Sequence, residues 1–266
     1  MTQITPDIRA AAEAIFAARE TLTQIPPVRE SHGIADVEAA YAVQALNTAR
    51  WIEAGRRPVG AKIGLTSKAV QDQLGVGEPD FGTLWADYAF GEGDVVPLRR
   101  FMQPKVEAEI AFVIGRRLDD PQISLTRLTG AIDCAYAAVE IVDSAIAAWN
   151  IRLADTVADN ASGGGFALGT EPRRIGDVDL RLGGMVLTLN GRPASIGVGA
   201  ACLGHPLNAT LWLARRMAEL GRPLEAGDIV LSGALGPMVP VAAGDVCTVE
   251  IQGFAPLSFV FGDKHP

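Results

Sequence analysis

The chain has 266 residues, of which 48% are hydrophobic and 20% are charged, which is the composition of an ordinary globular protein with ample core. Its net charge of -8 argues against nucleic acid and anionic membranes as main partners. The start of the chain lacks the basic-then-apolar form of a signal peptide, and no apolar run reaches about 18 residues, so we expect a cytoplasmic protein. The cysteines are far apart and odd in number, which favours reduced core thiols over disulfides: Cys134, Cys202 and Cys247.

Helical patterns occupy the beginning of the chain. Residues 6–22 are rich in alanine with helical spacing, and the prolines at 26 and 27 end this helix. Residues 36–54 form a second amphipathic segment. We therefore predict a helical N-terminal region at residues 1–56, followed by a catalytic domain at residues 57–266.

Strand patterns dominate the rest of the chain. Residues 57–66 predict a short strand, 67–74 a helix and 75–82 a loop. Val95 and Val96 are expected to begin the sheet that holds a longer strand at 104–115. A helix from Ser124 to about Ala135, capped by Ser124, leads into a strand around Glu140. The three glycines at 163–165 are expected to form a loop that closely approaches a ligand.

The last third of the chain alternates strands with one helix. His205 precedes that helix, where capping or packing is its expected role. The predicted elements are strands at 185–190, 228–232, 245–252 and 257–261 and a helix at 208–220. Together these patterns predict an α+β fold with helices around a mixed sheet that curls on itself.

The strand at 104–115 carries two glutamates on one face. Its apolar residues, from Val106 to Ile114, alternate on the opposite face. Glu107 and Glu109 therefore point the same way, with backbones about 7 Å apart, and their side chains can converge. An edge strand with a solvated glutamate face would show the same pattern.

A third glutamate makes a metal site the stronger interpretation. Glu140 lies in the middle of the apolar run 137–142, where a charge is unexpected. Carboxylates grouped in an apolar setting cost several kcal/mol unless a cation cancels the charge. Because oxygen ligands favour hard ions, Glu107, Glu109 and Glu140 predict a site for Mg²⁺ or Mn²⁺.

Two further charged residues are candidates on local grounds. Lys62 lies in a strand between apolar neighbours, and a lysine is rarely buried without a partner. Asp80 is followed by Phe81-Gly82-Thr83, a rigid turn that could aim its carboxylate into a cavity. An aspartate that bonds to its own backbone in a turn explains Asp80 equally well.

Several segments of the chain carry a family resemblance. They are KIGLTS (62–67), PDFGTLWAD (79–87), PKVEAEIAFVIG (104–115), VEIVDS (139–144), WNIRLADTVADNASGG (149–164), CLGHPLNA (202–209) and GDIVLSGALGPMVPV (227–241). In this order, over nearly the whole chain, they resemble the 2-oxopent-4-enoate (2-hydroxypenta-2,4-dienoate) hydratases of the fumarylacetoacetate hydrolase superfamily. The related 4-oxalocrotonate decarboxylases and 2-oxohept-3-enedioate hydratases share these motifs, and the stretch at 149–164 favours the hydratase branch.

The resemblance implies a mixed β-sandwich roll, a homo-oligomer, and a hydratase that acts in the meta-cleavage breakdown of aromatic compounds. Its metal-ligand pattern falls on the three glutamates already singled out. The expected reaction adds water to 2-hydroxypenta-2,4-dienoate and gives 4-hydroxy-2-oxopentanoate. A complex with a decarboxylase or an aldolase of the same pathway is a further expectation from the resemblance.

Roles for individual residues follow from that reaction. We expect Lys62 to hold the substrate carboxylate or 2-oxygen, or to move a proton if burial lowers its pKa; a lysine that only pairs with a metal-site glutamate is an equal alternative. Asp80 is the candidate base, and Ser162 with Asn160 would orient the water. The loop with Gly233, Ala234 and Leu235 would offer backbone amides to the substrate.

One position departs from the family pattern. The family commonly has arginine directly after the VxS motif, whereas this chain has Ala145, and Arg152 is a candidate substitute. Two alternatives therefore stand beside the hydratase: a decarboxylase of 4-oxalocrotonate type, and a non-catalytic partner subunit of one.

Overall fold

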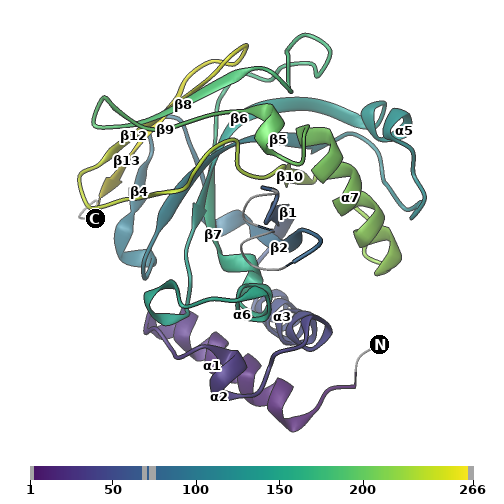
Figure 1. Ribbon diagram of the computed structural model, residues 1–266, viewed down its shortest axis with the longest axis vertical. Helices are drawn as coiled ribbons and strands as arrows, with labels where there is room; N and C mark the ends of the chain where they lie inside the picture. The colour runs from purple at the N-terminus through teal and green to yellow at the C-terminus, as the bar shows by residue number, and fades with distance from the viewer. Residues whose placement is uncertain (1–2, 68–70, 72–75, 263–266) are drawn as a thin grey trace.

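The structure is a computed structural model that describes residues 3–67, 71 and 76–262. Figure 1 shows the N-terminal helices gathered on one side of the molecule, below the β-sheets, with α7 along another flank. The helices are α1 (Pro6–Thr21), α2 (Val28–Ser31), α3 (Val37–Glu53), α5 (Leu125–Thr129), α6 (Leu153–Ala158) and α7 (Pro206–Glu219). Short 3₁₀ turns are η1 (Ala86–Tyr88), η2 (Leu98–Arg100), η3 (Ala147–Trp149), η4 (Asn160–Ser162) and η5 (Gly199–Ala201).

The strands form two sheets. The larger has the order β2-β1-β10-β5-β6-β7-β3, with β11 also paired to β5, and the smaller has the order β4-β13-β12-β8-β9. Both contain parallel and antiparallel pairs, which confirms the predicted α+β fold with mixed sheets. The strands are β1 (Pro58–Gly64), β2 (Asp80–Trp85), β3 (Ala89–Gly91), β4 (Val95–Pro97), β5 (Lys105–Ile114), β6 (Ile132–Val142), β7 (Gly163–Leu168), β8 (Gly184–Leu189), β9 (Arg192–Val198), β10 (Ile229–Leu231), β11 (Val239–Pro240), β12 (Val246–Ile251) and β13 (Leu257–Gly262).

Strand β5 separates the main core from the face that carries the glutamates. One face packs into the main core through Val106, Ala108, Ile110, Phe112 and Ile114, each at most 1% exposed. The other face carries Glu107, Glu109 and Ala111, and Ala111 belongs to a separate small apolar cluster. The predicted alternation of this strand is therefore confirmed.

The N-terminal helices pack against the segment that follows β6. Helix α1 begins at a Thr5 cap and α3 at an Asp36 cap, whose side chains accept backbone hydrogen bonds from Ile8 and Ala39. Their buried apolar residues share one cluster with Ile146, Ala154, Val157 and Ala158. We propose that the division between the two parts of the chain falls near residues 56–57, just before β1.

Four expectations about local structure need correction. Val95 and Val96 lie in β4, which pairs with β13 in the smaller sheet instead of joining the sheet of β5. Asp80 begins strand β2 instead of a turn. The glycines at 163–165 begin strand β7, where a Cβ on Gly164 would lie 2.6 Å from the Ile141 carbonyl oxygen, so they permit close approach to β6. Helix α5 keeps its Ser124 cap but ends at Thr129, because Gly130 follows.

Other expectations agree with the structure. The imidazole Nδ1 of His205 caps α7 by accepting from the Leu207 amide. Cys134, Cys202 and Cys247 are free thiols, and the last two are buried. The helix expected at 67–74 lies mostly outside the described residues. Among the described helices, none is long and apolar enough to cross a membrane.

The apolar face of β5 can be tested by mutation. Replacing Ile110 by alanine removes a side chain that is 1% exposed, so we expect it to lower the free energy of unfolding by about 2–5 kcal/mol. The control Val113→Ala lies half-buried on the opposite face of β5 and should cost only about 1 kcal/mol. Urea unfolding followed by circular dichroism measures both, and equal losses would contradict this placement of the core.

Candidate metal centre

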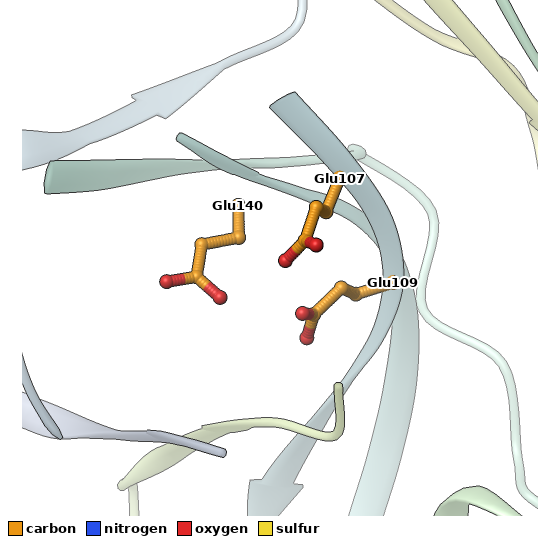
Figure 2. Close-up of side chains that lie close together, drawn as sticks. All are labelled: Glu107, Glu109 and Glu140. Carbon is orange, nitrogen blue, oxygen red and sulfur yellow. The ribbon is translucent and has the colours of Figure 1, made fainter. Parts of the chain in front are cut away.

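Three glutamates from two neighbouring strands come together at one point (Figure 2). Glu107 and Glu140 are direct partners in the antiparallel register of β5 and β6, and Glu109 lies two residues further along β5. One oxygen of each carboxylate lies within 4.8 Å of one oxygen of each of the others. The register therefore produces the convergence that the sequence spacing indicated.

The environment of these carboxylates favours a cation. Glu109 and Glu140 are 0% and 1% exposed. Glu109 Oε1 and Glu140 Oε2 have no hydrogen-bond partner in the described part of the chain. Burial and then repulsion from Glu140 raise the pKa of both Glu107 and Glu109 above the ordinary value. All the donor atoms are carboxylate oxygens, so the residues fit a hard divalent ion such as Mg²⁺ or Mn²⁺.

Lys62 extends from β1 into the same site. Its Nζ lies 2.9 Å from Glu140 Oε1, and the side chain is 3% exposed. Burial alone would lower the pKa of this amine, but Glu140 and Asp80 raise it, and the net pKa lies above its ordinary value. These carboxylates therefore favour the charged ammonium form of Lys62 over a lysine with a lowered pKa.

Asp80 lies beside Lys62 at the beginning of β2. Its carboxylate is buried, and its place at the start of a strand argues against an aspartate in a turn. Burial raises its pKa to about 6, against the opposing effect of Lys62. The neighbouring strand gives Asp80 its space, because Gly64 is its cross-strand partner and a Cβ there would lie 2.2 Å from Asp80 Oδ1.

A left-handed turn at η4 places Ser162. Asn160, Ala161 and Ser162 have φ angles of 55°, 52° and 53°. For residues other than glycine this conformation costs about 1–2 kcal/mol each, so surrounding contacts must hold it. The Ser162 hydroxyl lies 3.0 Å from the Thr156 hydroxyl, and both residues are buried.

The side chain of Asn160 already has a structural partner. Its Oδ1 accepts from the Thr83 amide at 2.7 Å, and its Nδ2 donates to the Thr83 carbonyl at 3.0 Å. Asn160 therefore ties the turn to β2. The role predicted from the sequence, in which Asn160 orients a water molecule, stays a prediction.

The loop after β10 holds Glu109 through a backbone hydrogen bond. The Gly233 amide donates to Glu109 Oε2 at 2.8 Å, and Gly233 has φ of +109° with Thr66 packed against its Cα. Leu235 is fully buried, and its amide donates to the Ala108 carbonyl while its own carbonyl accepts from Val198. The amides of Gly233 and Leu235 thus already have partners within the chain, and their contact with a substrate stays a prediction. Ala234 is half-buried between them.

An arginine that the sequence analysis missed lies next to these elements. Arg19 of α1 contacts Asp143 and Asp159, both about 1% exposed. Arg152, the candidate substitute for a family arginine, is exposed instead. Ala145 is fully buried, and its amide donates to Asp159 Oδ2 at 2.7 Å. A signal was present, because Arg19 follows Ile15 by four residues on the buried stripe of α1.

The raised pKa values predict how stability changes with pH. In an unfolded chain the pKa of a glutamate is about 4.3 and that of an aspartate about 3.9. In the fold, the pKa of Glu107 is raised to about 7 and that of Asp80 to about 6. Between these values the folded protein holds more protons than the unfolded chain, so without metal its stability should fall as pH rises from about 4.5 to about 7.5. A divalent ion offsets the repulsion, so saturating Mn²⁺ should raise Tm more at pH 8 than at pH 5.

Thermal unfolding in EDTA and in Mn²⁺ at both pH values measures this effect. The Glu109→Gln variant removes one charge from the cluster and should weaken both the pH dependence and the Mn²⁺ effect. A Tm gain of equal size at both pH values would show that these carboxylates do not hold the ion.

Comparison with known proteins agrees with this fold and site. Residues 48–261 match the family model for the fumarylacetoacetate (FAA) hydrolase C-terminal region. A protein of Pseudomonas putida named TodF product hydratase is 56% identical over 260 residues, which cover 98% of this chain and 97% of the relative. A 2-keto-4-pentenoate hydratase of Paraburkholderia xenovorans is 52% identical over 251 residues, 94% of this chain and 93% of the relative.

A solved structure shows the same architecture. The 4-oxalocrotonate decarboxylase from Pseudomonas putida G7, complexed with magnesium and adipate, superposes with a TM-score of 0.92 at 36% identity, over 98% of this chain and 99% of that chain. A fumarylpyruvate hydrolase from Pseudomonas aeruginosa, at 16% identity and a TM-score of 0.60, shares the fold over 78% of this chain. The chain therefore belongs to the fumarylacetoacetate hydrolase family.

Proposed function

We propose that this protein is a metal-dependent hydratase that adds water to 2-hydroxypenta-2,4-dienoate and gives 4-hydroxy-2-oxopentanoate. The observation that carries the proposal is the convergence of Glu107, Glu109 and Glu140 in a chain that is 48–56% identical to proteins named as hydratases of this type. Such a role places the enzyme in the meta-cleavage breakdown of aromatic compounds.

The three glutamates would hold Mg²⁺ or Mn²⁺. Structures of a related decarboxylase contain magnesium in one case and calcium in another. They support a divalent ion in this protein but do not identify which one. When bound, such an ion supplies a Lewis acid for the 2-oxygen of a keto acid and stabilises its enolate. Each glutamate would offer the ion one oxygen, and the carboxylate and 2-oxygen of the substrate are further oxygen donors of the kind that such an ion would take.

Lys62 would act as a fixed positive charge beside the substrate. Its ammonium group is buried and stays protonated, so it can donate to the carboxylate or the 2-oxygen of a planar dienoate. As negative charge develops on the 2-oxygen, this contact strengthens. Its ion pair with Glu140 also fixes one metal ligand, so the two roles predicted for Lys62 are compatible.

Asp80 would move the protons. With a pKa of about 6, it is mostly a carboxylate at neutral pH and can accept the proton of the 2-hydroxyl group. Delivery of a proton to C5 gives an α,β-unsaturated ketone, and water then adds at C4 while C3 gains a proton. The paired hydroxyls of Ser162 and Thr156 would orient that water, and the Ala234 amide is the loop group that we propose for the substrate.

A decarboxylase is the second candidate, because the 4-oxalocrotonate decarboxylase structure superposes over nearly the whole chain. Its identity of 36% is lower than the 48–56% shared with the 2-keto-4-pentenoate hydratases and the TodF product hydratase, which favours the hydratase. A non-catalytic partner subunit was suggested by Ala145 alone. Because Arg19 brings an arginine to the Asp143 and Asp159 carboxylates that surround this position, Ala145 gives that alternative little support.

The location and assembly complete the proposal. We propose a cytoplasmic homo-oligomer that acts on a small-molecule substrate. Association with a decarboxylase or an aldolase of the same pathway also stays a prediction.

Purified protein with Mg²⁺ or Mn²⁺ should remove the ultraviolet absorbance of 2-hydroxypenta-2,4-dienoate, with 4-hydroxy-2-oxopentanoate as the product by NMR. The Glu107→Gln variant should lose about 100-fold or more in kcat/KM, because it loses a metal ligand. Release of CO₂ from 4-oxalocrotonate, with no hydration of the dienoate, would identify the decarboxylase instead. Metal binding without either reaction would support the partner subunit.

The position of Asp80 can be tested through Gly64. Alanine at position 64 needs no unusual backbone angle, but its Cβ would collide with Asp80 Oδ1, so we expect kcat to fall by about 10-fold or more while the protein stays folded. The matched control is Gly184→Ala, a strand glycine with no atom within 4 Å of an added Cβ. Steady-state kinetics compares them, and full activity in Gly64→Ala would remove Asp80 from the proposed role.

A further inference from the structure

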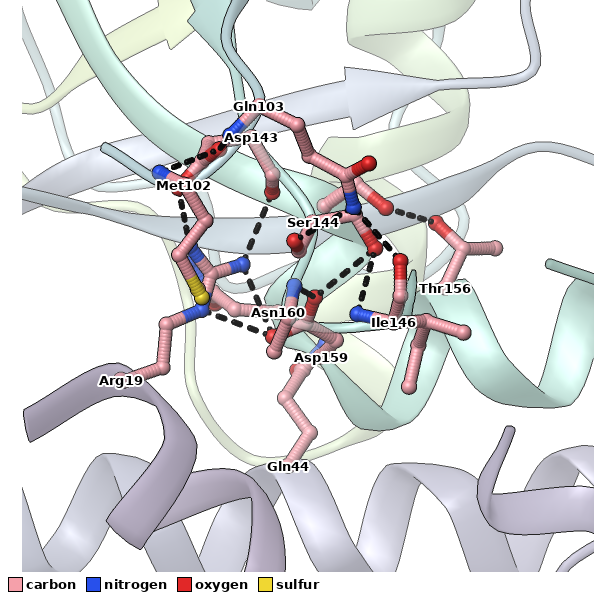
Figure 3. A network of polar contacts seen from close by, with 12 residues as sticks. Arg19, Gln44, Met102, Gln103, Asp143, Ser144, Ile146, Thr156, Asp159 and Asn160 are labelled. Carbon is pink, nitrogen blue, oxygen red and sulfur yellow. Dashed lines mark hydrogen bonds and ion pairs between the residues drawn. The ribbon is translucent and has the colours of Figure 1, made fainter. Parts of the chain in front are cut away.

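Arg19 connects α1 to both sides of the turn that carries Ser162 (Figure 3). Its Nε donates to Asp159 Oδ1 at 2.8 Å. Its Nη1 donates to Asp143 Oδ2 at 3.1 Å, and its Nη2 donates to the Asp143 carbonyl at 2.8 Å. One guanidinium group therefore holds two buried aspartates that are far apart in sequence.

The backbones of these two aspartates also form hydrogen bonds with the backbone of Ser162. The Ser162 amide donates to the Asp159 carbonyl at 2.9 Å, and the Ser162 carbonyl accepts from the Asp143 amide at 2.8 Å. Asp143 follows Glu140 by three residues at the end of β6. A displacement of either aspartate would thus be transmitted to the Ser162 backbone, and the guanidinium group fixes both.

The turn itself needs such support. Its three residues are left-handed, and Ala161 has no side-chain hydrogen bond that could hold this conformation. Asn160 holds one side of the turn against Thr83 of β2. On the other side, Asp159 accepts from Arg19, the Ala145 amide and the Ser144 hydroxyl. Arg19 is the residue that α1 contributes to this network, and Gln44 of α3 donates to the Val157 and Phe81 carbonyls nearby.

We propose that Arg19 is a positioning residue, which fixes the left-handed turn and through it the hydroxyl of Ser162 at the reaction site. The inference rests on the proposed function, because Ser162 is assigned there to the water. It extends the site into α1, although the polar contacts of Arg19 go to Asp143 and Asp159 and not to the three glutamates. Arg19 therefore acts on the position of Ser162 and not on the affinity of the site for the ion.

The test compares two conservative variants of buried arginines. Lysine at position 19 keeps the charge, but its single nitrogen replaces the three guanidinium nitrogens that donate to Asp143 and Asp159. Arg19→Lys should therefore lower kcat by about 10- to 100-fold. KM and the affinity for Mn²⁺ should stay within about 3-fold of wild type. The control is Arg29→Lys. Arg29 of α2 is 11% exposed against 14% for Arg19, and it pairs with the buried Asp155, which does not bond to Ser162. Its kcat should stay within about 3-fold.

A second measurement does not depend on turnover. Hydrogen exchange followed by mass spectrometry should show faster exchange of the segment 159–165 in Arg19→Lys, with unchanged exchange in the core of β5. Wild-type protein that lacks hydratase activity would contradict the proposed function, while this exchange pattern would still decide whether Arg19 holds the turn. Unchanged exchange at 159–165 would overturn the inference.

Glycine at position 161 provides the rescue. Because glycine adopts left-handed angles without strain, Ala161→Gly in the Arg19→Lys background should recover about 3-fold or more of the lost kcat. If Arg19→Lys does not fold alone, the double variant is measured against Ala161→Gly. No recovery, a loss of Mn²⁺ affinity equal to the loss of kcat, or failure of both variants to fold would overturn the positioning role.

Discussion

The site depends on an imbalance of charge within a small, mostly buried volume. The carboxylates of Glu107, Glu109 and Glu140 lie together, with Asp80 beside them and Lys62 paired with Glu140. With all four carboxylates ionised, burial without a further cation is expensive, because each unpaired charge costs several kcal/mol. The arrangement therefore favours binding of a doubly charged ion, which would relieve the repulsion between the carboxylates.

The register of β5 and β6 converts this charge pattern into geometry. Pairing of Glu107 with Glu140 brings two carboxylates from different strands face to face, and the two-residue spacing in β5 adds Glu109. The apolar face of β5 packs into the main core, which fixes the register, since a shift by one residue would turn the glutamates into the main core and move Ile110 and Phe112 to the opposite face. The main core and the glutamate cluster thus use the two faces of one strand.

The sequence predicted the parts of the site that follow from periodicity. Alternation in β5 placed Glu107 and Glu109, and the apolar run around Glu140 made that charge conspicuous. The capping positions Ser124 and His205 followed from local chemistry, and helices begin directly after them. These features depend on interactions between residues that are close in sequence, which is why they could be found without a structure.

Long-range pairing explains what the sequence could not predict. The partner of β4 is β13, from the other end of the chain, and no local signal distinguishes the two sheets. The glycines at 163–165 did mark a close approach, but to the backbone of β6 and not to a ligand. Gly233 and Asn160 were singled out correctly as unusual positions, yet their hydrogen bonds go to Glu109 and Thr83. Arg19 depends on two partners more than 120 residues away.

The family match covers residues 48–261 and so contains every glutamate of the metal cluster, but helix α1 lies before it. The glutamate cluster is therefore part of the scaffold that the family shares, whereas the guanidinium group that holds Asp143 and Asp159 comes from a helix outside the matched region. A change in α1 can thus alter the turn that carries Ser162 and leave the glutamate cluster unchanged.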